Sequence, residues 1–182
     1  MSALRRIFSR RRMKRCLKDE GGVAAIEAGF LFPIMLMILC GMIDMGAALV
    51  ANLKVTNACQ IIADLLARDR ATNDAQIDDA IVAGRLALTP YNTDTYGVDI
   101  AGIQYVGSAL TPTIRWRETV NMDENDNVLA RSEGLGLQNE GVIAVTVRYT
   151  FRPFFAGYVM NDFVMSEEAY VRGRKGLFVA RE

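Results

Sequence analysis

One stretch of this sequence limits what the chain can fold into more than any other. Residues 23–43 form an apolar run of 21 positions that contains a single charged residue, Glu27. A helix of that length spans about 31 Å, close to the hydrocarbon thickness of a bilayer. The sequence therefore predicts a transmembrane helix over residues 23–44. Pro33 removes one backbone hydrogen bond inside it, so we expect the helix to bend there.

Charge is unevenly divided on the two sides of this run. Residues 1–20 carry eight basic and two acidic side chains, a net charge of +6, although the whole chain is formally neutral. Basic residues directly before an apolar span stay in the cytoplasm, so we expect a cytoplasmic leader at residues 1–22 and a periplasmic body at residues 45–182. Nucleic-acid binding is the alternative role for the tail. Phe8 is its only aromatic residue available for base stacking, so topology is favoured and no nucleic-acid partner is predicted.

A cleaved secretory signal peptide is the main alternative for this N-terminal region. A basic stretch followed by an apolar one fits that assignment. The small residues that cleavage requires follow at Ala47, Ala48 and Ala51. However, the apolar run is longer than in most signal peptides and contains Glu27. A lipoprotein signal at Cys40 is also disfavoured, because Leu39 occupies the position where a small residue is needed.

Helical periodicity continues beyond the apolar run. Over residues 44–70, apolar residues recur at spacings of three and four, which indicates that the membrane helix continues as an amphipathic rod. Asp44 is expected to mark the exit of this helix into water. A second amphipathic helix is predicted over residues 74–88, capped by Asn73 or Asp74 and ended by Thr89-Pro90.

From Val98 onward the apolar period changes to two, which indicates strands. The alternation slips at Gly102 and predicts a β-bulge there. In the second strand, we expect Ile114 and Trp116 to share one face and Arg117 to lie on the other. The predicted strands cover residues 98–105, 114–120, 142–151 and 163–172.

The segments between and after these strands predict the rest of the architecture. Residues 131–141 contain three glycines and are predicted to form a loop, and residues 173–182 are predicted to be a frayed terminus. Short polar links favour antiparallel pairing, and the two helices can cover one face of the sheet. The predicted class is α+β: a pilin-like chain whose long N-terminal membrane helix continues into a periplasmic domain with a second helix and a small antiparallel sheet.

The body lacks a residue pattern that would support catalysis. The chain has no histidine, and its three cysteines are too scattered for a disulfide or a metal motif. The acidic stretch from Asp123 resembles a calcium loop, but it has Val128 and Gly134 where that loop needs Gly and Glu. Glu167 and Glu168 are neighbours in a strand and should point to opposite faces. We therefore predict no catalytic residue, no metal site and no cofactor.

Glu27 is the one charged residue of the apolar run, and its presence there needs an explanation. If the chain were cut between Gly22 and Val23, Val23 would carry a new α-ammonium group and Glu27 would be the fifth residue. A buried carboxylate needs a partner, and the amino terminus of a neighbouring subunit could supply it. The alternative is a carboxylate at the cytoplasmic interface, with the buried span beginning after it.

These residues resemble a type IV prepilin, in which a short basic leader ending in Gly precedes an apolar helix with Glu at its fifth position. More narrowly, the chain looks like the TadE-like minor pseudopilins of the tight-adherence (Flp) pilus. The resemblance covers residues 20–70 and extends faintly into the Tyr149–Pro153 strand end. Its motifs are Glu20-Gly21, Ala24-Ala25, Glu27, Phe30-Leu31-Phe32-Pro33 and Asp44-Met45-Gly46.

The resemblance implies a non-enzymatic protein of the bacterial inner membrane. It implies cleavage between Gly22 and Val23 by a prepilin peptidase, an assembly role for Glu27, and partners among other pilins, pseudopilins and pilus-assembly proteins. The alternative is an uncleaved single-pass envelope protein whose periplasmic domain binds a partner.

Overall fold

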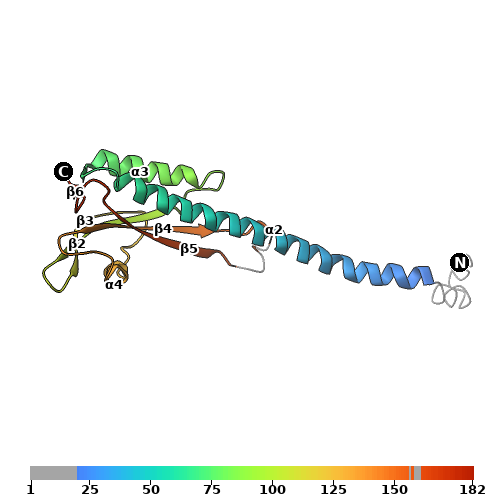
Figure 1. The fold of residues 1–182 in the computed structure, drawn as a ribbon. Coiled ribbons are helices and arrows are strands. Elements are labelled where there is room, and N and C mark those ends of the chain that lie inside the picture. Colours follow the sequence, from blue (N-terminus) through green and yellow to red (C-terminus); the bar gives the residue numbers. More distant parts are fainter. Residues whose placement is uncertain (1–19, 156, 158–160) are drawn as a thin grey trace, which may run out of the picture. The chain divides into compact units, whose positions relative to one another are not determined.

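The computed structural model of the protein describes residues 20–155, 157 and 161–182 (Figure 1). Most of the predicted cytoplasmic leader therefore lies outside the described residues. The chain divides into two compact units, one ending at Met45 and the other, the body, covering Gly46–Glu182. The described part of the first unit consists entirely of helix.

Helix α2, Glu20–Leu66, is the longest element and contributes to both units. It is helical throughout and includes Pro33, so the predicted long helix is confirmed, whereas the bend at Pro33 stays a prediction. Within the body, the last part of α2 packs against the sheet through small and branched side chains. Those buried completely or nearly so are Ala51, Val55, Ala58, Cys59, Ile62, Ala63 and Leu66.

The rest of the body consists of a second long helix, a four-stranded antiparallel sheet and three short elements. The sheet has the order β3-β2-β4-β5, and this arrangement confirms the predicted α+β class. The elements are β1 (Ala71–Thr72), α3 (Asp74–Ala87), β2 (Gly97–Val106), β3 (Thr111–Val120), α4 (Val128–Ser132), β4 (Gly141–Phe151), β5 (Phe163–Arg172) and β6 (Ala180–Arg181).

Helix α3 begins and ends where the sequence predicted. The side chain of Asn73 accepts a hydrogen bond from the backbone N–H of Gln76, and the Gln76 side chain accepts one from the backbone of Asn73. At the other end, Lys54 of α2 donates to the carbonyl of Thr89 at 2.6 Å. Gly84 allows α3 to lie close to α2, because an added Cβ would meet the Ile62 side chain at 2.5 Å.

The main core lies between α2, α3 and one face of the sheet. Val98 and Ile100 of β2 and alternate residues of β4 meet the buried side chains of the two helices there. Full burial of each large aliphatic side chain contributes about 1.5–3 kcal/mol. The alternating apolar residues from which these strands were predicted are thus the residues that fill the core.

The predicted irregularity at Gly102 is present, but the extra residue lies on the neighbouring strand. Pairing of β2 with β3 shifts between Gly102 and Ile103, and the skipped residue is Arg115 of β3. Ile114 therefore packs in a second cluster with Ile103, whereas Trp116 packs in the main core. The prediction that Ile114 and Trp116 share a face is wrong, because a bulge between them reverses the alternation.

The second face of the sheet is covered as well. The segment predicted as a loop over residues 131–141 begins inside a short helix, α4, so this prediction is wrong at its start. Val128 of α4 is buried against Ala101, Ile103 and Ala144. A helix of only five residues has too few turns to show an apolar period, so the sequence pattern gave no sign of it.

Residues 173–182 are ordered and do not fray as predicted. Strand β6 pairs in parallel with β1, and Val179 is buried in the main core. The indole N–H of Trp116 donates to the carbonyl of Val179 at 2.9 Å. Ion pairs Arg174–Asp64 and Lys175–Asp69, both at 2.8 Å, tie the segment to the end of α2 and the turn after it. This C-terminal strap, residues 173–182, is held by contacts distant in sequence, which a local pattern does not reveal.

Candidate membrane and assembly site

The apolar part of α2 in the first unit exposes its large side chains on every side. From Val23 to Met45, these side chains are 48–74% exposed. Soluble proteins rarely leave so much contiguous apolar surface uncovered. Within the described chain, α2 is the one helix long and apolar enough to cross a membrane. One N-terminal apolar helix fits a single-pass membrane protein, as predicted.

All four residues predicted for processing, assembly and bending lie on this helix. Gly22, Val23 and Glu27 are exposed and fall within its first two turns, and Pro33 follows further along. Val23 and Glu27 are four residues apart, so they lie on the same side of the helix. Cleavage after Gly22 and pairing of Glu27 with a neighbouring subunit stay predictions.

Asp44 lies at the end of the apolar run, and its role as the point where the helix exits into water stays a prediction. The side chain belongs to a residue that is only 5% exposed. A buried carboxylate needs compensating interactions, and Asp44 is not without a partner. The acidic residue at the end of the apolar run is therefore buried.

Cys59 lies in the body half of α2 and faces the sheet. Its thiol donates a hydrogen bond to the carbonyl of Val145 at 3.1 Å. Burial raises the pKa of this thiol to about 12, so it stays protonated at neutral pH. A protonated, buried thiol is a poor nucleophile, and Cys59 acts as a core residue. Cys40 and Cys59 are both free thiols.

A buried carboxylate organises the second face of the sheet. Asp99 of β2 accepts two hydrogen bonds from Arg117, at 2.8 and 2.6 Å, and one from Thr119 at 2.8 Å. The backbone N–H of Asn125 adds a further bond at 3.0 Å. Burial would raise the pKa of Asp99, but the bonds from Arg117, Asn125 and Thr119 outweigh it, so its pKa is lowered. The sequence analysis missed this network, although an Asp inside an apolar strand was a signal for it.

The same loop is fastened a second time through Glu168 of β5. Asn125 donates to Glu168 at 2.7 Å, Tyr170 donates to it at 2.9 Å, and Arg131 of α4 pairs with it at 2.9 Å. Glu167 instead meets Asn52 of α2 at 3.4 Å. The prediction that Glu167 and Glu168 point to opposite faces is confirmed. Both carboxylates are engaged in structural contacts, and the arrangement fixes the loop after β3 and helix α4 onto the sheet.

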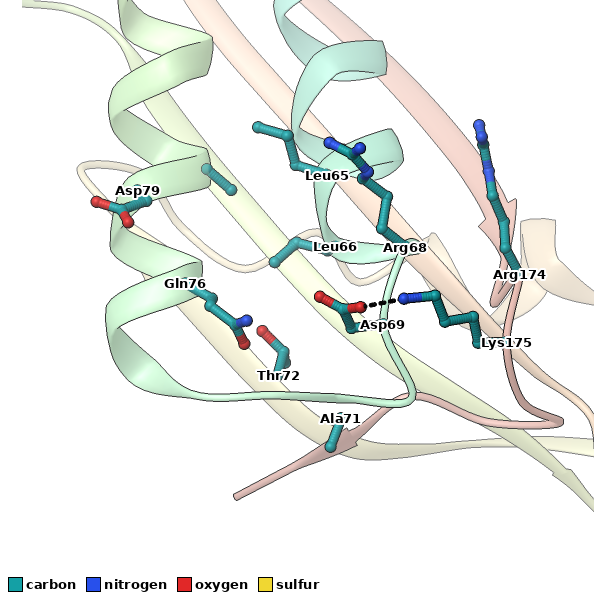
Figure 2. Close-up of a pocket in the computed structure, with 11 residues that line it drawn as sticks. Leu65, Leu66, Arg68, Asp69, Ala71, Thr72, Gln76, Asp79, Arg174 and Lys175 are labelled. Carbon is teal, nitrogen blue, oxygen red and sulfur yellow. Dashed lines mark hydrogen bonds and ion pairs between the residues drawn. The ribbon is translucent and has the colours of Figure 1, made fainter.

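A cavity of about 510 Å³ with a mixed polar and apolar lining lies near the end of α2 and the start of α3 (Figure 2). Leu65 and Leu66 form apolar parts of its lining, and Lys175 of the strap reaches across to Asp69. The Thr72 hydroxyl, also in the lining, is the one buried side-chain oxygen or nitrogen among the described residues that has no hydrogen-bond partner. This cavity can hold water or a small polar group. Its charged side chains already form ion pairs within the protein or are exposed to solvent, so they do not form a dedicated binding site.

A second cavity, of about 570 Å³, lies beside the last residues of β4. Four aromatic residues, Tyr91, Tyr149, Phe151 and Phe154, form part of its walls. Tyr91 and Phe151 meet edge to face with ring centroids 6.4 Å apart, and Phe151 stacks at a tilt on Phe163 at 5.4 Å. Groups of three or more potential metal ligands are absent from the described residues.

Comparison with known proteins agrees with the interpretation of helix α2. Residues 22–64 match the family model for TadE-like protein. Curated proteins and solved structures give no match to the chain. The predicted resemblance to TadE-like proteins is thus confirmed over the apolar part of α2 and most of its amphipathic continuation, and it indicates an association with tight-adherence pili.

Proposed function

We propose that this chain is a minor pseudopilin or pilus-assembly protein of a tight-adherence (Flp) pilus. The apolar part of α2 anchors it in the bacterial inner membrane, with the leader in the cytoplasm and the body in the periplasm. The observation that carries this proposal is a coincidence of three features. The TadE-like match, the exposed apolar surface and Glu27 all fall on the same stretch of α2.

Processing is the first part of the proposed function. A prepilin peptidase cuts between Gly22 and Val23, and the new α-ammonium of one subunit pairs with Glu27 of another. A carboxylate inside a bilayer is costly without such a partner, which gives the position of Glu27 a physical reason. The proposed partners are therefore other pilins or pseudopilins, pilus-assembly proteins and the peptidase.

The body supports a structural rather than an enzymatic role. Several of its charged side chains take part in the networks around Asp99 and Glu168 and in ion pairs that fasten the strap. Those contacts hold the loop after β3, helix α4 and the strap in place. We propose that the body presents a surface to partner proteins of the pilus machinery.

The test is the amino-terminal sequence and intact mass of the protein extracted from membranes of cells that carry the pilus system. A mature chain beginning at Val23 supports the proposal. A chain that retains its leader supports the uncleaved envelope protein instead. Glu27→Gln should leave cleavage intact but reduce piliation, and Glu27→Asp serves as the matched control that retains the charge. Normal piliation with Glu27→Gln contradicts the pairing.

A further inference from the structure

Large apolar side chains of the body are exposed together at one end of strands β4 and β5. Phe154 is 74% exposed and Phe155 53%, in the segment that follows β4. Phe163 begins β5, and its pairing with Phe151 brings it to the same end of the sheet. We call Phe154, Phe155 and Phe163 the aromatic end. Such clustering of exposed apolar side chains marks an interaction surface.

The aromatic end lies beside the place where α2 enters the body. Tyr91 donates a hydrogen bond to the carbonyl of Ala47 at 3.0 Å, and its ring contacts Phe151. Ala47 and Ala48 also pack against the core cluster that contains Phe151. Along the chain, Ala47 comes only three residues after Asp44, where the apolar run ends. The surface therefore lies near the first residues of α2 in the body, which follow the apolar run directly in sequence.

We infer that the aromatic end inserts into the boundary between headgroups and acyl chains of the bilayer that α2 spans. This inference rests on the proposed membrane span. Phenylalanine is among the residues whose apolar side chains bury into that boundary, and burying their surface there removes it from water. Arg152 is the nearest cation in sequence, and it pairs with Asp162 at 3.1 Å. Because this charge is neutralised, apolar contact rather than attraction to anionic lipid holds the surface, and added salt should not release it.

The other end of β4 offers a control on the same sheet. Leu137 is 62% exposed and lies in the loop just before β4 begins at Gly141. Ten residues of extended strand separate Gly141 from Phe151, a distance of about 33 Å. A side chain at Leu137 is equally exposed but belongs to the end of the sheet that should stay in water.

The experiment uses the full chain in vesicles of phosphatidylethanolamine and phosphatidylglycerol, with part of the lipid brominated near the carbonyl end of its acyl chains for position 154 and near their middle for position 36. A tryptophan probe is introduced separately as Phe154→Trp, Leu137→Trp and Leu36→Trp. The native Trp116 is only 8% exposed and is common to all variants, so the wild-type spectrum is subtracted. We expect the emission of the Phe154→Trp and Leu36→Trp probes to shift to the blue and be quenched, and that of Leu137→Trp to resemble a probe in water.

The Leu36→Trp probe separates the two proposals. Quenching at position 36 without quenching at position 154 overturns the insertion of the aromatic end and leaves the membrane span intact. Absence of quenching at position 36 overturns the span, and the inference falls with it. If the probe at position 154 shifts to the blue only as protein concentration rises, and is not quenched, the surface binds a protein instead and the inference is overturned.

Discussion

Helix α2 places two kinds of helical surface in one continuous element. In the first unit, every large apolar side chain from Val23 to Met45 is about half exposed or more. In the body, the same helix buries one side completely and leaves the other to polar residues and scattered aliphatic ones. The first stretch requires an environment that the chain itself does not supply, whereas the second receives its environment from the sheet and α3.

The difference between the two stretches lies in pattern as much as in composition. The residues of α2 that meet the sheet are largely small or branched, such as Ala51, Val55 and Ala58, and they recur at spacings of three and four. Small residues permit a helix to lie close to a sheet, and the spacing keeps them on one side. The first stretch has no such period, because lipid or other helices would surround it entirely. Mutations in the two halves of α2 should therefore affect different quantities, namely membrane insertion for the first stretch and stability of the body for the second.

The largest effect is expected at the buried side of the body half. Ile62 is fully buried in the main core, so Ile62→Ala should lower the free energy of unfolding by about 4 kcal/mol through lost burial and the cavity left behind. The matched control is Ile61→Ala, since Ile61 is adjacent but 38% exposed, and it should cost less than about 1 kcal/mol. Urea unfolding followed by Trp116 fluorescence measures both. Equal losses would show that α2 does not dock on the sheet by this side.

A charge in the middle of the first stretch should have the next largest effect, and on a different quantity. Leu36→Arg should raise the free energy of membrane insertion by about 3 kcal/mol, because arginine at the centre of a span is poorly solvated. The body should still fold, since Leu36 belongs to the other unit. The control Leu53→Arg changes an exposed position of the body and should alter neither quantity by more than about 0.5 kcal/mol. Carbonate extraction of membranes reports insertion, and full retention of Leu36→Arg would contradict the span.

Local pattern was sufficient to predict most of the elements. The limits of α3 followed from Asn73 and Pro90, and the strands followed from their alternation. Errors arose where pairing between distant residues decides the outcome. The glycine at position 102 marked the irregular register, but only the partner strand shows that Arg115 is the extra residue. Gly102 also gives space to the Trp116 indole, which would meet an added Cβ at 2.2 Å.

The functional and buried polar residues also divide into those that a local sequence pattern could predict and those that it could not. Gly22, Val23, Glu27 and Pro33 could be named from the sequence because their proposed roles depend on spacing along one helix. The network around Asp99 could not, because its partners come from β3 and the loop after it, 18–26 residues further along the chain. Ion pairs of the strap join residues more than 100 positions apart, which no local pattern can reveal.

The third prediction concerns the strap. A change there should lower the stability of the body by less than the Ile62 variant does and should leave membrane insertion unaffected. Val179 is buried, and its carbonyl accepts the Trp116 bond, so Val179→Ala should lower the free energy of unfolding by about 2 kcal/mol. Membrane insertion should be unchanged, which distinguishes this variant from Leu36→Arg. The control Leu177→Ala removes a side chain of the same strap that is 65% exposed, and it should have little effect. If both variants behave like wild type in urea, the strap does not contribute to the core.

The smallest effect is a dependence of the stability of the body on pH. Folding lowers the pKa of Asp99 and of Glu168 through their hydrogen bonds, despite the opposing effect of burial. Unfolded Asp and Glu titrate at about 3.9 and 4.3. The stability from these two carboxylates is therefore complete above those values and is lost as pH falls through the lower folded pKa values. Urea unfolding between neutral and acid pH should show this loss, and Asp99→Asn and Glu168→Gln should each be less stable at neutral pH and lose less on acidification. If the double variant loses as much stability in acid as the wild type, these networks are not the source of the acid sensitivity.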